Sequence, residues 1–296
     1  MSETGLTTMN VKKINKNKVY SYIYKEKVTS KMQIVQQLQM GLSTVSQNLK
    51  LLEDEGLIER EGFFESTGGR KANAIQIVRT ARVAVGIGIL KDKILIAVID
   101  LYGDAVCRTE IAADYVQEDA YYKKLGKCLE DFIAGSRISP DAILGVSIAT
   151  QGVISTDGKS VSYGAIMHNS DMKLSDFEKY IPYPCRLVHD SKAAACLELW
   201  KHTDLQNALF ILLNPNLGGA IISDGTVQQG AHMRSGLLEH LCITQDGPLC
   251  YCGKRGCLET TAPPPHWKQP RRKKSPNFSW KSANQTPRCG TFGTTT

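Results

Sequence analysis

The segment His240–Glu259 reads HLCITQDGPLCYCGKRGCLE and brings together one imidazole and three thiols, those of His240, Cys250, Cys252 and Cys257. Imidazole and thiolate are the ligands of structural zinc sites, in which protein side chains fill all four tetrahedral positions. The glycines and the proline between these residues let the backbone fold back so that the side chains converge. We therefore expect a Zn²⁺ ion that holds the segment together and leaves no position for a reactive water.

The same segment resembles a family signature. A histidine followed by CxCGxxGCxE over residues 250–259 is similar to the zinc motif of the ROK family, whose members are bacterial sugar kinases or sugar-responsive repressors. The resemblance implies an actin-like (ribonuclease H-like) α/β domain of two lobes. The alternative for the three thiols is burial as small hydrophobic groups. Because charged Lys254 and Arg255 lie between them, the metal is the preferred interpretation.

Length and composition are typical of a chain with two domains. The chain has 296 residues, of which 42% are hydrophobic, enough for two cores. We find no apolar run that spans a bilayer and no basic-then-apolar leader, so the expected location is cytoplasmic, with no membrane partner. Six of the nine cysteines lie outside the motif, and their spacing shows no pattern typical of disulfide pairs, which favours a reducing compartment.

The charge is distributed in segments. Residues 1–80 carry 12 basic and 8 acidic side chains, residues 81–261 carry 17 and 21, and residues 262–296 carry 7 and none. The basic ends indicate a polyanionic partner, whereas the middle is mildly acidic.

The first 80 residues predict three helices. Apolar side chains recur at helical spacing among lysines in the first, and hydroxyl residues precede the other two as N-caps. The expected helices run over 11–27, from a cap at Thr29 or Ser30 through Leu38, and, after a turn at Gly41, from a cap at Ser43 through Glu53.

The last of these helices has two chemically different faces. Val45, Leu49 and Leu52 share one face. The opposite face presents groups that bond base edges and phosphates without a carboxylate that DNA would repel. These DNA-binding candidates are Thr44, Ser46, Gln47 and Lys50.

A strand beginning at residues 56–58 and a hairpin crossing a turn at 66–69 complete a winged helix-turn-helix domain over 1–80, with Arg70 and Lys71 on the wing. The alternative is a small protein-interaction domain, but the basic balance favours double-stranded operator DNA. The runs LSTVSQNLKLLEDEGLIE (42–59) and STGGRK (66–71) also resemble the N-terminal domain of ROK repressors, which the sugar kinases of the family lack.

Residues 81–261 contain both strand-like and helix-like segments, which indicates an α/β domain. Strands are expected at 83–90, 93–101 and near 105–110, a helix at 120–138 and a buried strand at 142–150. With the resemblance, residues 81–200 form the first lobe and residues 201–261 a partial second lobe that carries the zinc motif.

At the positions of the two turns that bind phosphate in ROK kinases, the sequence of this chain departs from the family pattern. The first turn reads GILKD (88–92), with a leucine and a carboxylate in place of small residues, and the second reads LNPNLGGAI (213–221), with a proline and no hydroxyl. Backbone N–H groups beside such side chains approach phosphate poorly. We expect that kinase activity is lost.

The sugar-binding side keeps part of the pattern. In LVHDSKAAA (187–195), Asp190 occupies the place of the kinase general base, so it is a candidate acceptor for a sugar hydroxyl; the alternative is a helix N-cap. Glu259 matches a second sugar-binding carboxylate, with a solvated charge as the alternative. His240 can serve the metal and a sugar with one ring nitrogen each. The family's glutamate three residues before this histidine is Leu237 here.

Residues 262–296 are basic and of low complexity, without apolar periodicity. We expect a disordered tail, with a basic nucleic-acid arm as the alternative. The second lobe would then be truncated, and the strands near Ile211 and Ile221 would lose apolar cover.

These patterns together predict a sugar-responsive repressor of carbohydrate-utilisation genes, a homodimer or higher oligomer with a sugar or sugar phosphate as effector. An active ROK sugar kinase and a DNA-binding protein without a sugar response are the alternatives.

Overall fold

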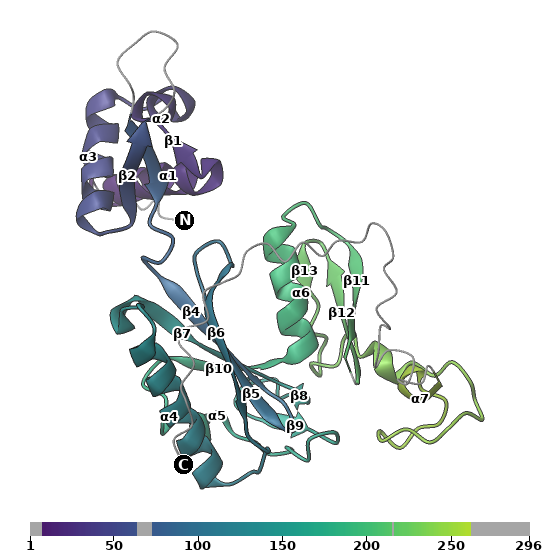
Figure 1. Cartoon of the computed structure of the whole chain (residues 1–296). Coiled ribbons are helices and arrows are strands. Elements are labelled where there is room, and N and C mark those ends of the chain that lie inside the picture. Colours follow the sequence, from purple (N-terminus) through teal and green to yellow (C-terminus); the bar gives the residue numbers. More distant parts are fainter. Residues whose placement is uncertain (1–7, 64–72, 215, 262–296) are drawn as a thin grey trace, which may run out of the picture. The chain divides into compact units, whose positions relative to one another are not determined.

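The structure, a computed structural model, describes residues 8–63, 73–214 and 216–261, and the chain divides after Ala81 into two compact units. Within the described ranges no helix is long and apolar enough to cross a membrane. Figure 1 shows both units, with labels on most of their helices and strands, and each unit is described by itself below.

The first unit packs three helices against a small antiparallel sheet of order β1-β3-β2. Apolar side chains from all three helices and from two strands are buried between them. The elements are α1 (Thr8–Glu26), β1 (Val28–Thr29), α2 (Lys31–Leu38), α3 (Leu42–Asp54), β2 (Ile58–Phe63) and β3 (Asn73–Ile77).

Local chemistry sets the ends of α2. Ser30 is its N-cap, as expected: its Oγ accepts from the Gln33 backbone N–H at 3.3 Å, and the Gln33 side chain accepts from the Ser30 N–H at 2.9 Å. Gln39 closes the helix in the left-handed conformation, at φ 51°. The cap expected at Ser43 is wrong, because α3 already begins at Leu42 with Gly41 as its N-cap.

The first lobe of the second unit is built on a five-stranded sheet of order β10-β7-β4-β5-β6. β4, β5 and β6 form an antiparallel meander, and β7 and β10 add in parallel. The sheet strands are β4 (Val83–Ile89), β5 (Lys93–Ile99), β6 (Ala105–Ala112), β7 (Ile143–Thr150) and β10 (Cys185–His189). The strands expected at 83–90, 93–101 and 142–150 are therefore confirmed.

Helix α4 (Asp119–Gly135) covers this sheet together with the short α5 (Leu174–Glu178). The Tyr122 and Phe177 rings meet edge to face at 4.9 Å between centroids and join the two helices. A 3₁₀ turn, η1 (Pro140–Ala142), leads into β7, and a two-stranded ribbon, β8 (Val153–Ile154) with β9 (Val161–Tyr163), follows it.

The second lobe is smaller. Helix α6 (Asp190–Lys201) packs on an antiparallel sheet of β11 (Ala208–Leu213), β12 (Leu217–Ser223) and β13 (Thr226–Val227). The segment then passes through the 3₁₀ turn η2 (Leu238–His240) to α7 (Leu258–Thr261). The observed architecture is thus a mixed α/β fold.

The outer face of β11 is apolar and solvent-exposed. Leu209, Ile211 and Leu213 alternate along it and are 67%, 52% and 51% exposed, while Ala208 and Phe210 pack inward. Ile211 is thus exposed, as expected, whereas Ile221 is half-buried, so the expectation of exposure is wrong for that side chain. The expected tail lies outside the described residues.

Candidate functional site

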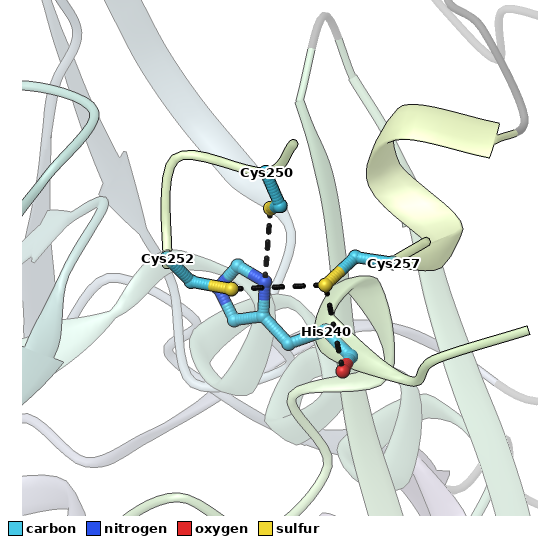
Figure 2. A group of neighbouring side chains, drawn as sticks. All are labelled: His240, Cys250, Cys252 and Cys257. Atoms are coloured by element: carbon cyan, nitrogen blue, oxygen red, sulfur yellow. Dashed lines mark hydrogen bonds between the residues drawn. The ribbon is translucent and has the colours of Figure 1, made fainter. Parts of the chain in front are cut away.

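The four residues of the zinc-like motif converge in the structure. The His240 nitrogen and the sulfurs of Cys250, Cys252 and Cys257 all lie within 4.8 Å of one another (Figure 2). Cys250 Sγ is 3.7 Å from His240 Nδ1, and Cys252 Sγ is 3.7 Å from Cys257 Sγ. The set can therefore hold one metal ion with four protein ligands.

The backbone around these ligands is tightly folded. Gly256, at φ 69°, has no room for a side chain, since a Cβ there would lie 1.5 Å from the Thr244 carbonyl oxygen. Burial raises the pKa of the Cys257 thiol to about 12. A buried thiolate needs a cation beside it, so the donor set and its burial fit a metal ion.

A cavity of about 420 Å³ lies beside the cluster, and His240 borders both. This volume suits a small organic ligand. Because His240 Nδ1 lies on the side of the thiols, the other ring nitrogen remains for the cavity. The titratable side chains at the wall include His189, Asp190, Glu239 and His240, with Arg234 and Lys254 exposed at the rim.

Asp190 is the first residue of α6, and it lines the cavity. The N-cap of this helix is His189, without a side-chain cap, so the alternative of Asp190 as N-cap is wrong. Asp190 Oδ1 accepts from the Ser191 backbone N–H at 2.6 Å. Burial nonetheless raises the pKa of Asp190 to about 6.

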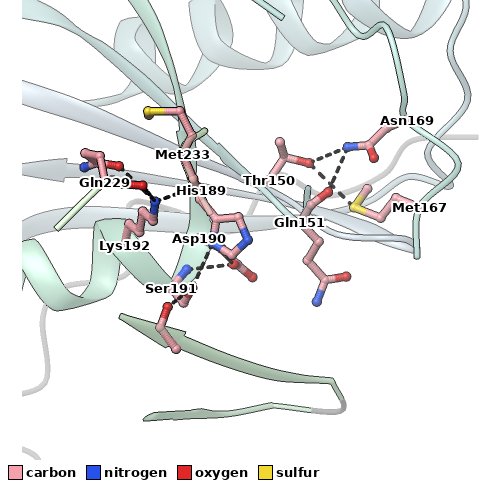
Figure 3. Close-up of polar contacts among 11 residues, drawn as sticks. Thr150, Gln151, Met167, Asn169, His189, Asp190, Ser191, Lys192, Gln229 and Met233 are labelled. Atoms are coloured by element: carbon pink, nitrogen blue, oxygen red, sulfur yellow. Dashed lines mark hydrogen bonds and ion pairs between the residues drawn. The ribbon is translucent and has the colours of Figure 1, made fainter. Parts of the chain in front are cut away.

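His189 and Ser191 form a short chain of hydrogen bonds (Figure 3). The Ser191 hydroxyl donates to the Gly219 carbonyl oxygen at 3.0 Å, so its contact of 2.8 Å with His189 Nδ1 requires the imidazole to donate. Burial lowers the pKa of His189 to about 4, which favours the neutral ring. His189 Nε2 is then an acceptor at the cavity.

Glycines in β12 and in the segment before η2 allow the elements around the cavity to pack closely together. A Cβ on Gly218 would lie 3.0 Å from Ser191 Cβ, and a Cβ on Gly219 would lie 2.6 Å from the Gly236 carbonyl oxygen. Gly236 has φ 80° and faces the Ala220 backbone. The two glycines of the LGG run thus seat α6 and the η2 segment on β12, a packing role that the sequence did not reveal.

Lys192 anchors the loop that leads to η2. Its ammonium is buried and donates to the Met233 carbonyl at 2.8 Å and to Gln229 Oε1 at 3.0 Å (Figure 3). Desolvation lowers its pKa. Gln151, which also lines the cavity, is held through its backbone carbonyl by buried Asn169, whose side chain donates at 3.0 Å.

Glu259 does not line the cavity. Its Oε1 accepts from Asn216 Nδ2 at 2.9 Å and its Oε2 accepts from the Leu217 N–H at 2.8 Å, so it holds the start of β12. It is 7% exposed, and the alternative of a solvated charge is therefore wrong.

Glu239 is the cavity carboxylate that sequence reasoning missed. It is 5% exposed and directly precedes His240. Burial, with the charges of Asp190 and Glu259, raises its pKa to about 7. Its place in the sequence directly before His240 was the available signal, but the expected spacing fell on Leu237.

In the first unit the DNA-binding candidates lie on α3. Gln47 and Lys50 are exposed, and Thr44 is half-buried. Ser46 donates its hydroxyl to the Leu42 carbonyl at 2.7 Å and receives a contact of 3.5 Å from Lys31, a basic residue that the prediction omitted. Arg70 and Lys71 lie outside the described residues.

Comparison with known proteins places the chain in a family. The model of the ROK family matches residues 83–281, which is more than half of the chain. This chain belongs to the ROK family.

ROK relatives of this chain include regulators. It is 24% identical over 255 residues to the "DNA-binding transcriptional dual regulator NagC" of Escherichia coli, covering 85% of this chain and 63% of that protein. It is 27% identical to the "Xylose repressor" of Bacillus subtilis, covering 85% and 66%. The chain thus spans less than two thirds of the length of these relatives.

Two solved ROK structures share the fold. A ROK family transcriptional regulator, a homologue of the E. coli MLC protein, superposes with a TM-score of 0.63 at 24% identity, covering 84% of this chain and 64% of its own. A glucokinase of Streptomyces griseus gives 0.53 at 22% identity, covering 60% and 56%.

The raised pKa of Asp190 predicts a pH-dependent cost in stability. The folded pKa of Asp190, about 6, lies above the ordinary value of 3.8. The stability that is fully present below pH 3.8, where the group is protonated in both states, is therefore lost as pH rises through 6. We expect Asp190→Asn to stabilise the protein at pH 7.5 by up to about 3 kcal/mol, with a smaller gain at pH 5. Denaturant unfolding at both pH values measures this. Exposed Asp204→Asn is the control, and an equal gain at both pH values would contradict the prediction.

Proposed function

We propose that this chain is a sugar-responsive, DNA-binding repressor of the ROK type, with a winged helix-turn-helix domain over residues 1–80 and a structural Zn²⁺ at His240, Cys250, Cys252 and Cys257. The observation that carries the proposal is the exposed polar face of α3, in a compact unit that precedes the ROK domain. The two relatives named above, a transcriptional dual regulator and a xylose repressor, match over 85% of the chain, which supports the same assignment.

The architecture of the first unit supports DNA as its partner. α2 and α3 are joined by a three-residue turn and followed by the β2–β3 pair, the element order of a winged helix. Val45, Leu49 and Leu52 are buried, which leaves Gln47 and Lys50 in solvent as base- and phosphate-contacting groups. Helix α1 adds exposed Lys12, Lys13 and Lys18, which suit the DNA backbone.

The cavity supports a sugar as effector. Asp190 and the second nitrogen of His189 offer acceptors to the cavity, and the second nitrogen of His240, which carries the ring proton when Nδ1 ligates the metal, offers a donor. Tyr163 and Tyr251 add aromatic surface of the kind that stacks on sugar rings. A ligand that binds this cavity better in one arrangement of the two lobes shifts their equilibrium. In a homodimer on a two-fold operator, that shift alters the spacing of the two α3 helices and weakens DNA binding.

Loss of kinase activity is part of the proposal. In the β4–β5 turn the Leu90 N–H is bonded to the Lys93 carbonyl at 2.9 Å, and exposed Asp92 adds a negative charge. A triphosphate there would lose a backbone donor and meet a carboxylate. Sugar-dependent release of ADP from ATP would contradict this part.

DNA binding is tested by selecting bound duplexes from a random pool, with and without N-acetylglucosamine, xylose and glucose. We expect a preferred site whose affinity falls when one of the sugars is present. Gln47→Ala should lower the preference for that site about five- to hundredfold, because it removes a base contact. Lys50→Ala should weaken binding to all duplexes alike and should make the affinity depend less steeply on salt concentration.

Lys123→Ala is the control for these variants, since this exposed lysine lies on α4 in the other unit. Failure to retain any duplex at low salt would contradict the DNA-binding half of the proposal. Unchanged affinity with every sugar would contradict the sensing half.

Metal analysis tests the structural zinc. We expect one Zn²⁺ per chain by mass spectrometry, and a lower melting temperature after chelation, because four protein ligands tie the loop to η2. Cys257→Ser should lose the ion, and exposed Cys196→Ser should retain it. Equal zinc in both variants, or none in the wild type, would contradict the assignment.

A further inference from the structure

The Glu239 carboxylate is an unexplained polar group at the cavity. The residue is 5% exposed, and its Oε2 has no hydrogen-bond partner among the residues that the structure describes. A buried carboxylate oxygen without a donor is costly, so native proteins rarely keep one without a reason. Glu239 lines the same cavity as Asp190 and His240.

Among the candidate carboxylates near His240 in the sequence, Glu239 is the one that reaches the cavity. It directly precedes His240, whereas the residue three positions before that histidine is Leu237. Both Leu237 and Glu239 line the cavity, so an apolar side chain and a carboxyl group contribute to it from one short segment. The oxygens of Glu259 are occupied by Asn216 and Leu217, and Glu259 does not line the cavity.

We propose that Glu239 accepts a hydrogen bond from a sugar hydroxyl and thereby determines which sugar binds. This inference rests on the proposed function, and it adds the residue and the kind of ligand group. Asp190 and Glu239 line the same cavity, so an anionic ligand group between these two carboxyl groups would meet repulsion. The ligand therefore presents an uncharged hydroxyl at this end.

The test is a thermodynamic cycle of binding affinities, in which one substitution in the protein is combined with the removal of one hydroxyl from the sugar. Binding of glucose, N-acetylglucosamine and xylose to the full chain is measured by calorimetry, and the sugar that binds is then replaced by its monodeoxy analogues. Glu239→Gln keeps the size of the side chain and removes the carboxylate. We expect this variant to bind the parent sugar about ten- to hundredfold more weakly, because a hydrogen bond to a charged group is lost.

The cycle also identifies the hydroxyl. One deoxy analogue should bind the wild type weakly and should lose nothing further in the Glu239→Gln variant, because its partner group is already missing. A merely structural role of Glu239 would weaken all analogues alike. Glu198→Gln, on a half-buried glutamate of α6 whose side chain is 47% exposed and does not line the cavity, is the matched control and should leave every affinity unchanged.

The outcomes separate this inference from the proposed function. Wild-type binding that Glu239→Gln leaves unchanged, or that it weakens equally for all analogues, overturns the inference alone. Absence of binding by any of these sugars to the wild type overturns the sensing function and this inference with it. Zinc content is measured in the same preparations, because Glu239 adjoins the proposed ligand His240.

Discussion

The close approach of α6 and the η2 segment to strand β12 is the contact on which the candidate site depends. Gly218 and Gly219 carry no side chain at the point where Ser191 and the Gly236 backbone reach the strand. The Ser191 hydroxyl bonds the Gly219 carbonyl across this contact. Asp190 begins α6 and Glu239 lies in η2, so the glycines bring both carboxyl groups to one cavity.

The same contact links the cavity to the loop that carries the four candidate metal ligands. His240 ends η2, borders the cavity and belongs to the four-ligand set. A metal ion that fixes this imidazole would also orient the neighbouring Glu239, since both residues belong to one 3₁₀ turn. The loop therefore shapes the cavity, although its ligand set has no open position for catalysis.

Local patterns allowed most elements to be predicted. Ser30 was identified as a cap because a capping box involves only four residues, and the strands of the first lobe follow from their apolar runs. The spacing of His240, Cys250, Cys252 and Cys257 predicted which side chains converge, because the segment itself folds them together. Ser43 was misplaced because Gly41 competes with it two residues earlier and leaves Ser43 inside the helix.

The cavity wall could be predicted only in part, because tertiary contacts decide it. Glu259 has the right position in the motif, but Asn216 and Leu217, more than 40 residues earlier, occupy its oxygens. Glu239 lacks the family spacing, yet the η2 turn buries it at the cavity. The packing role of Gly218 and Gly219 likewise depends on residues that are distant in sequence.

Denaturant unfolding of Gly219→Ala, compared with Gly86→Ala, tests the central claim most directly. A Cβ at Gly219 would lie 2.6 Å from the Gly236 carbonyl oxygen, whereas a Cβ at Gly86, in strand β4, would meet nothing within 4 Å. The account predicts that Gly219→Ala lowers the free energy of unfolding by about 2 kcal/mol or more, as overpacking does, while Gly86→Ala lowers it little or not at all. A Gly219→Ala variant with the same free energy of unfolding as the wild type would contradict this prediction.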